Sequence, residues 1–407
     1  MRISNQLILN TYLERLEIIQ NKLFKNWENI TTGKQLLYPS DNPLTIVRAL
    51  QLRTYLSEIK TSSQVGEHLS SFFNLYESTL SQIVDIGHRA QELAITGRNV
   101  YSNSEEMKEA LISELNYLLD NLISIGNSIW ENTYVYSGTA TKTKPFEKEH
   151  LPINPNAVLN SAGYQIPPTS GTITINGVPI NINVNVDTTN DVLNRIMASI
   201  PGMTATYDSI TDRITLTYPG NITIGSDTDT SNWLKAVKLY SGVNSITSTD
   251  TIGTDRVNFN GNSEIRNVNI SGINFELNFV GSNQLNPLNR GLFIDVNKGI
   301  NIFQAIIDVR DKIMGGNLDE TTMNSLEKAV ENAIEIYTLV GGKGKRLEAL
   351  NTNNNDFEGV ISKELSNIED LDIAKGSIEY NTINYYYQVN LMVSARLFQN
   401  NLLNYLK

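Results

Sequence analysis

The residue types that most often carry chemistry are scattered along this sequence. His68, His88 and His150 stand alone, because none has a second histidine or an acidic residue at a metal-ligand spacing that stands out from chance. The chain has no cysteine, which excludes disulfides, thiolate metal sites and a cysteine nucleophile. The signatures GxSxG, HExxH and GxGxxG do not occur in their structural contexts. We therefore predict no catalytic residue, no metal and no cofactor, and we interpret the histidines as structural or surface residues.

Two short segments could bind a phosphate or a cation. GGKGK (residues 341–345) has the glycines and lysine of a phosphate loop, but it lacks the GxxxxGK[ST] spacing and does not follow a predicted strand. We interpret it as a break in a helix. GSDTDTSN (residues 225–232) has aspartates two residues apart, as calcium loops do. It lacks the glycine at position 6 and the glutamate at position 12, which favours a solvated turn.

Three aromatic residues lie close together in the sequence at Tyr134, Tyr136 and Phe146. A platform of exposed rings for a ligand is one interpretation of this group. Packing of the rings against a bundle of helices is the other, and it is the favoured one because large aromatic side chains dominate protein cores.

Length and charge limit the classes of protein that this chain can belong to. A chain of 407 residues is long enough for two or three domains, at about 150 residues per domain. The 32 basic and 43 acidic residues give a net charge of -11 at pH 7. This balance disfavours nucleic acid as a partner, because nucleic-acid binding needs a basic patch. It also disfavours adsorption to anionic membranes.

No targeting segment is evident in the sequence. No run approaches the ~18 apolar residues of a membrane-spanning helix. The N-terminus does not resemble a secretory signal, because polar residues interrupt any apolar stretch there: Arg2, Ser4, Asn5, Gln6 and Asn10. We expect either a cytoplasmic protein or one exported by a route that uses no cleaved signal.

Both ends of the chain carry an apolar stripe at the spacing of a coiled-coil helix. Alternating steps of four and three residues keep one helix face apolar. Because the stripes match, we predict that the two ends pair and that the middle is an insertion. The N-terminal stripe is Leu9, Leu13, Leu16, Gln20, Leu23, Trp27 and Ile30, and the C-terminal stripe is Ile378, Thr382, Tyr385, Val389 and Met392, followed by Leu403 and Leu406.

Long amphipathic helices are predicted on both sides of the insertion. Three of them are expected between residues 41 and 130, the first beginning after Pro43 and the last at a capping box formed by Ser102 and Glu105. Helical periodicity returns at residue 300 and continues to the C-terminus. Long helices with narrow apolar faces are typical of a rod-like bundle.

The middle of the chain has the alternation of β-strands. Residues 171–186 alternate apolar and polar side chains around Asn176-Gly177, which is a typical hairpin turn. A short helix at residues 191–200 and two further strands complete a β-β-α-β-β module at about 170–240. Further strand-like stretches follow in residues 256–296.

The sequence thus predicts an α+β multidomain protein, with a long antiparallel helical rod built from both ends of the chain and a β-rich middle. We predict terminal coiled-coil helices at residues 1–40 and 365–407, a helical rod at residues 41–145 and 300–364, and an outward insertion at residues 146–299.

Local motifs agree with this layout and resemble the bacterial flagellin superfamily. MRIS, NITTGKQLLYPSDNP and the helices up to Trp130 resemble its N-terminal region, although SDNP stands where SDDP is more usual. FQAIIDVRDKI, VGGKGKRLEAL and residues 366–407 resemble its C-terminal region, with VGGKGKR in place of the usual VGA-R-N-R. The β-β-α-β-β module is similar to an insertion found in flagellins and hook-associated proteins. Residues 243–297 match nothing specific.

One segment is more specific. ENTYVYSGTATKTKPF (residues 131–146) resembles a PF-containing pattern of the hook-associated branch of the superfamily, with Tyr136 where phenylalanine is usual. The resemblance implies an extracellular structural subunit that joins the flagellar hook to the filament and has no enzymatic activity. It also implies unfolded export by the flagellar type III route without a cleaved signal.

The resemblance implies partners as well: copies of the same chain in a ring or layer of a helical tube, a neighbouring hook-associated protein, flagellin, and an export chaperone that binds the C-terminal helix. A filament flagellin, a coiled-coil surface adhesin with a β-rich head, and an enzyme are the alternatives. We predict that the terminal helices contact other subunits through Leu9, Leu13, Leu16, Leu23, Trp27, Ile30, Tyr385, Val389, Met392, Leu403 and Leu406.

Overall fold

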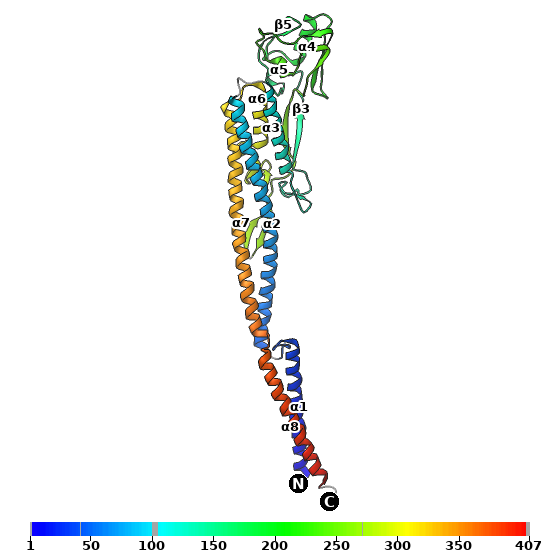
Figure 1. Cartoon of the computed structure of the whole chain (residues 1–407), viewed down its shortest axis with the longest axis vertical. Coiled ribbons are helices and arrows are strands. Elements are labelled where there is room, and N and C mark those ends of the chain that lie inside the picture. The colour runs from blue at the N-terminus through cyan, green and yellow to red at the C-terminus, as the bar shows by residue number, and fades with distance from the viewer. Residues whose placement is uncertain (1, 41, 100–104, 271, 404–407) are drawn as a thin grey trace. The chain divides into compact units, whose positions relative to one another are not determined.

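The computed structural model describes residues 2–40, 42–99, 105–270 and 272–403 (Figure 1). It is 55% helix and 19% strand, with helices toward both ends of the chain and strands in the middle. The predicted α+β class is confirmed. The chain divides into a terminal unit, Met1–His68 with Leu347–Lys407, and a central unit, Leu69–Arg346. The three-part division expected from the sequence stays a prediction.

The long helices are α1 (Arg2–Thr32), α2 (Pro43–Asn99), α3 (Glu105–Gly126), α6 (Ile302–Gly315), α7 (Glu320–Glu369) and α8 (Ile373–Leu403). The prediction of three helices between residues 41 and 130 is wrong, because α2 runs unbroken where two were expected. The polar residues in the middle of α2 form hydrogen bonds with α7. The Ser63 hydroxyl hydrogen-bonds the Asn355 carbonyl at 2.9 Å, and the Asn354 amide donates to Ser62 at 3.3 Å.

Helix α7 also continues through GGKGK, so the predicted helix break is wrong. Each glycine in a helix costs about 1 kcal/mol relative to alanine. The apolar side chains on either side of this segment, Val340 and Leu347, are buried, and their packing outweighs that cost. A Cβ atom built on Gly341, Gly342 or Gly344 would meet nothing within 4 Å, so no close contact requires a glycine there.

An antiparallel ribbon of two strands, β3 (Phe146–Leu151) and β9 (Thr254–Phe259), leads into and out of a β-rich module. The module has its own core, formed entirely by buried residues from Ile153 to Ile252. Its elements are η1 (Leu159–Ser161), β4 (Gly171–Ile175), β5 (Val178–Ile182), α4 (Thr189–Ser199), β6 (Thr204–Asp208), β7 (Arg213–Ile222), α5 (Trp233–Ala236) and β8 (Gly242–Thr247).

Local signals explain how the module forms. Strands β4 and β5 form a hairpin across Asn176 and Gly177, whose φ angles of 49° and 77° suit the turn type that asparagine and glycine favour. Helix α4 begins with a capping box, in which Thr188 and Asp191 each bind the other's backbone N–H. Strands β6, β7 and β8 form an antiparallel sheet, with Ile214 and Leu216 of β7 turned into the core.

The remaining strands are short and lie beside the helices of the central unit. A hairpin of β10 and β11 is held to α7 by an ion pair between Lys343 and Glu276, and the Arg346 guanidinium lies over the Phe275 ring. These strands are β1 (Ile129–Trp130), β2 (Thr133–Tyr134), β10 (Asn267–Ile270), β11 (Ile273–Glu276), β12 (Val280–Ser282), β13 (Gly291–Asp295) and β14 (Ile300–Asn301).

Two of the three aromatic residues noted in the sequence belong to a core and not to an open platform, while Tyr134 in β2 is half-buried. Tyr136 and Phe146 are fully buried, and each packs against the ring of Phe293. The Tyr76 hydroxyl donates to the Val135 carbonyl at 3.0 Å and accepts from the Phe279 N–H at 3.2 Å. Burial raises the pKa of both Tyr76 and Tyr136 well above the usual range. These rings therefore serve packing.

Candidate assembly surface

Helices α1 and α8 lie side by side within the terminal unit (Figure 1). Their internal seam contains buried or half-buried side chains at steps of four and three residues. Gly376 brings the helices close together, since a Cβ there would lie 3.5 Å from a side-chain carbon of Ile30. The seam residues are Tyr12, Leu16, Ile19, Leu23, Asn26 and Ile30 on α1, and Gly376, Tyr380, Ile383, Tyr387, Asn390 and Ser394 on α8.

This seam is unusually polar. The Tyr12 hydroxyl lies 3.2 Å from both the backbone and the side-chain carbonyl oxygens of Asn390. The side-chain oxygens of Asn26 and Asn29 are buried and have no hydrogen-bond partner among the described residues. A buried polar atom without a partner costs about 1–3 kcal/mol. The α1–α8 pair is therefore weakly held by its own contacts.

Hydrogen bonds and an ion pair, here called the clasp, connect the segment that follows α1 with the segment that precedes α8. The Leu371 N–H donates to the Gly33 carbonyl at 2.9 Å, and the Gln35 N–H donates to the Glu369 carbonyl at 2.8 Å. Lys34 pairs with Asp370 at 2.5 Å, and its hydrogen bond lowers the pKa of that carboxyl. The clasp fixes where α1 ends and α8 begins.

The residues predicted as subunit contacts fall into two groups. Leu16, Leu23 and Ile30 lie in the internal seam. By contrast, Leu13 and Trp27 on α1 are about half exposed, and Tyr385 and Met392 on α8 are more than 60% exposed. Val389 is half-buried. The side chains of Leu9 and Leu403, and all of Leu406, lie outside the described residues.

The stripe predicted to pair α8 with α1 is not the one that does so. Ile378, Tyr385 and Met392 are exposed, whereas Tyr380, Tyr387 and Asn390 are half-buried, and Asn390 contacts Tyr12 of α1. Sequence reasoning missed these three because two faces of α8 carry side chains at the same spacing, and the face with Ile378, Tyr385 and Met392 was taken as the seam. Helix α8 therefore has two stripes, one turned toward α1 and one left open.

The terminal unit has many exposed large apolar side chains and few fully buried ones. Among its described residues, the buried apolar side chains are Ala49, Leu347 and Leu350. Soluble monomers rarely expose large contiguous apolar areas, and such areas mark interaction sites. The exposed apolar residues include Leu7, Leu13, Ile18, Phe24 and Trp27 on α1; Leu44, Val47, Leu50 and Tyr55 on α2; Phe357 and Val360 on α7; and Ile378, Tyr385, Tyr386, Leu391, Met392 and Val393 on α8.

The histidines have structural surroundings. His150 lies 2.9 Å from Asp212 and 3.1 Å from Asp255, and His88 contacts Gln91. Across the described part of the chain, no group of three or more histidine or acidic residues is placed to hold a metal ion. In that same part, no helix is long and apolar enough to cross a membrane.

Comparison with known proteins identifies the family. The model of the bacterial flagellin N-terminal helical region matches residues 3–141, and that of the C-terminal helical region matches residues 323–406. The two regions together make up more than half of the chain. The chain belongs to the bacterial flagellin family, whose members are structural parts of the bacterial flagellum. This membership confirms the prediction that the chain is not an enzyme.

The relatives are more specific. The chain is similar to flagellar hook-associated protein 3 of Escherichia coli (strain K12), with 27% identity over 150 residues, which is 37% of this chain and 47% of that protein. It is equally similar to the same protein of Salmonella typhimurium, with 27% identity over 149 residues, or 36% of this chain and 47% of that protein. The match thus spans about half the length of these curated relatives.

Solved structures are more distant in sequence. A putative flagellar hook-associated protein from Vibrio parahaemolyticus has a TM-score of 0.47 at 13% identity, covering 81% of this chain and 100% of that one. Bacillus cereus FlgL has a TM-score of 0.42 at 10% identity, covering 79% and 100%.

Proposed function

We propose that the chain is a structural subunit that joins the flagellar hook to the filament, and its similarity to proteins named flagellar hook-associated protein 3 supports this. The carrying observation is the terminal unit, which exposes many large apolar side chains and buries few. Exposed apolar surface of this kind marks a site where other chains bind. The proposed partners are copies of this chain, a neighbouring hook-associated protein and flagellin.

Assembly is proposed to proceed through α1 and α8. Their internal seam holds them weakly, since the buried side-chain oxygens of Asn26 in the seam and of Asn29 three residues later have no hydrogen-bond partner among the described residues. The open stripes, with Trp27 on α1 and Tyr385 on α8, are left for neighbouring copies. Because these stripes are different surfaces, the contact is head-to-tail and propagates around a tube instead of closing a dimer.

Export follows from the same features. An exposed apolar stripe on α8 needs a cover before assembly, which supports a chaperone bound to the C-terminal helix. A chain without cysteine cannot form disulfides during or after transit. We propose export by the flagellar type III route to the hook–filament junction outside the cell.

The test uses a strain that lacks its own junction protein. The double variant Trp27→Ser and Tyr385→Ser removes two half-exposed rings and should leave the thermal unfolding of the monomer unchanged. We expect it to be exported but to leave filaments unattached. The matched control is Leu285→Ser with Leu288→Ser, which removes apolar side chains that are 72% and 95% exposed in the central unit. Normal filament attachment by the Trp27/Tyr385 variant would refute the proposal.

A filament flagellin is the second candidate, because both matching family models are those of flagellin. Immunogold labelling distinguishes the two. A junction subunit is expected at the hook–filament boundary only, whereas a flagellin would be labelled along the whole filament.

A further inference from the structure

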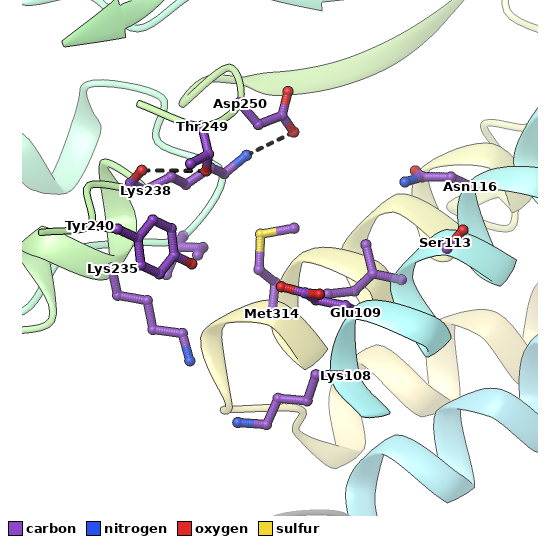
Figure 2. Close-up of a pocket in the computed structure, with 12 residues that line it drawn as sticks. Lys108, Glu109, Ser113, Asn116, Lys235, Lys238, Tyr240, Thr249, Asp250 and Met314 are labelled. Atoms are coloured by element: carbon purple, nitrogen blue, oxygen red, sulfur yellow. Dashed lines mark hydrogen bonds and ion pairs between the residues drawn. The ribbon is translucent and has the colours of Figure 1, made fainter. Parts of the chain in front are cut away.

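A cleft opens in the central unit between the β-rich module and the helices α3 and α6, with a volume of about 310 Å³. Figure 2 shows its two walls, with Tyr240, Thr249 and Asp250 on the module and Ser113 and Asn116 on α3. The rest of the lining is apolar at Ile112, Ile166 and Met314 and charged at Lys108, Glu109, Lys235 and Lys238. A concave site with apolar walls and a few polar groups is the usual form of a ligand pocket.

The walls are held in place by a buried polar network. The Arg310 guanidinium donates to the Asn116 carbonyl at 2.9 Å and to Asp255 at 2.8 Å, so the amide of Asn116 is oriented with its N–H groups left to donate. Lys238 donates to Gln165 at 2.7 Å and to Asp250 at 3.3 Å. A preformed site loses little conformational entropy when a ligand binds.

The polar groups in the cleft suit hydroxyl groups. Ser113 and Thr249 supply hydroxyls, which both donate and accept, and Asn116 supplies an amide. The Tyr240 side chain is 64% exposed, so its ring can pack against the C–H face of a sugar ring. Charged side chains of both signs also line the cleft, namely Lys108, Lys235 and Lys238 with Glu109 and Asp250, and Lys238 pairs with Asp250. Neither sign dominates the site.

A second surface leads to this cleft. On the outer face of the β6–β7–β8 sheet, hydroxyl residues lie opposite one another on all three strands. The register forms two rows, Thr206–Thr215–Thr247 and Thr204–Thr217–Ser245. Neighbouring members contact, with the hydroxyl oxygens of Thr215 and Thr247 2.9 Å apart. The alternation of β8 continues through exposed Thr249, which lines the cleft.

The chemistry of both surfaces favours an uncharged ligand rich in hydroxyls. The two rows contain no charged side chain, and the pair that follows them in the register of β6 and β7, Asp208 and Arg213, combines one negative and one positive charge. A nucleic acid needs a basic surface instead. Threonine is common on exposed strands for packing reasons alone, but packing does not explain a cleft with an exposed tyrosine at the end of the rows.

We propose that this site binds a neutral oligosaccharide. One sugar ring occupies the cleft against Tyr240, and the following sugars lie along the hydroxyl rows. The proposal concerns the central unit only and does not depend on the role of the terminal helices.

Isothermal titration of the full chain with neutral and with acidic oligosaccharides tests the proposal, preceded by a glycan array to choose the probes. We expect a neutral oligosaccharide to bind, and Tyr240→Ala to weaken that binding at least tenfold. The matched control is Tyr117→Ala, which removes an equally exposed ring, 67% exposed, that lies on α3 outside the cleft lining. Binding of no glycan, of acidic glycans only, or an equal loss in both variants overturns the proposal.

A second pair of variants tests the rows. Thr204→Val with Thr217→Val replaces two hydroxyls by methyls of nearly the same shape. Binding of a disaccharide is expected to stay unchanged, while binding of a longer oligosaccharide weakens severalfold. If both lengths are unaffected, the rows are not part of the site.

Discussion

Asp212 is expected to hold the β-rich module to the rest of the central unit. This aspartate has 1% of its surface exposed and adopts a φ of 50°, a conformation that asparagine also tolerates. One carboxylate oxygen accepts from the Ile153 N–H at 3.1 Å and the Tyr207 hydroxyl at 2.7 Å. The other accepts from the Ile252 N–H at 3.0 Å and the Gly253 N–H at 2.6 Å.

These contacts join the two chain segments that connect the module to the β3–β9 ribbon. Ile153 follows β3, and Gly253 precedes β9, so a single carboxylate binds both chain segments. His150 of β3 adds a contact at 2.9 Å. The variant Asp212→Asn keeps the shape and the φ angle but replaces one oxygen by an NH₂ group, which cannot accept from Ile252 and Gly253.

The Ile252 N–H keeps a second acceptor, the backbone carbonyl of Asp212 at 3.2 Å, so the expected loss follows from the Gly253 N–H. A buried N–H left without an acceptor costs about 1–3 kcal/mol, so the module should lose about 2 kcal/mol of unfolding free energy. For a module of about 100 residues, such a loss lowers the midpoint of thermal unfolding by about 10 °C. Calorimetry of the full chain measures this shift, and hydrogen exchange at Ile252 and Gly253 assigns it to the module.

The control is Asp208→Asn in the same turn. Asp208 is exposed and binds the Ile210 N–H and the Thr211 hydroxyl, so its replacement should change the midpoint little. An Asp212→Asn protein that unfolds at the same temperature as the Asp208→Asn protein would refute the proposed role of Asp212.

Three further predictions follow from other parts of the chain. Replacing Gly341, Gly342 and Gly344 by alanine should stabilise α7 by up to about 1 kcal/mol each, because the added methyl groups meet nothing; a lower denaturation midpoint would contradict this. At Asp255, burial raises the pKa, but the hydrogen bonds of Arg310 and His150 and the positive charges of Arg310 and Lys148 together outweigh it, and the net pKa is lowered. Its contribution is therefore complete above the unfolded value near 4 and lost as pH falls through the lower folded value. At the more deeply buried Asp311, desolvation prevails and the pKa is raised. Acid unfolding of the Asp255→Asn variant is therefore compared with that of the native chain, so that the contribution of Asp255 is measured separately. An equal loss of stability in both proteins on acidification would contradict the role assigned to Asp255. Deleting residues 1–30 should leave a soluble protein with the native unfolding transition of the central unit but without filament attachment, and restored attachment would contradict the role of α1.

Features that depend on neighbouring residues were predictable from the sequence. The hairpin at Asn176–Gly177 follows from the preference of these two residues for positive φ angles. The helical ends follow from the 4-3 spacing of apolar residues. The continuity of α2 and α7 was not predictable in this way, because the polar and glycine-rich stretches are held by packing between the two helices, as at Ser63 and Asn355.

Features that depend on contacts between distant segments could not be predicted from the sequence either. The donors to Asp212 come from three separate parts of the chain, around Ile153, Tyr207 and Ile252. On α8, two faces carry side chains at the same spacing, so periodicity alone could not decide which face contacts α1. Tyr387 was overlooked for this reason, while Tyr385 was assigned to a seam that it does not enter.

Trp27 offers the most direct test of the proposal that the open stripes are covered by neighbouring copies. Its side chain is 51% exposed in the single chain, whereas Trp233 is fully buried. The fluorescence of the purified full chain is measured alone and after assembly onto isolated hooks, and the Trp27→Phe spectra are subtracted to leave the Trp27 signal. The proposal predicts that the Trp27 emission shifts to shorter wavelength on assembly, because the ring leaves water. An emission maximum that stays the same in the assembled state would contradict it.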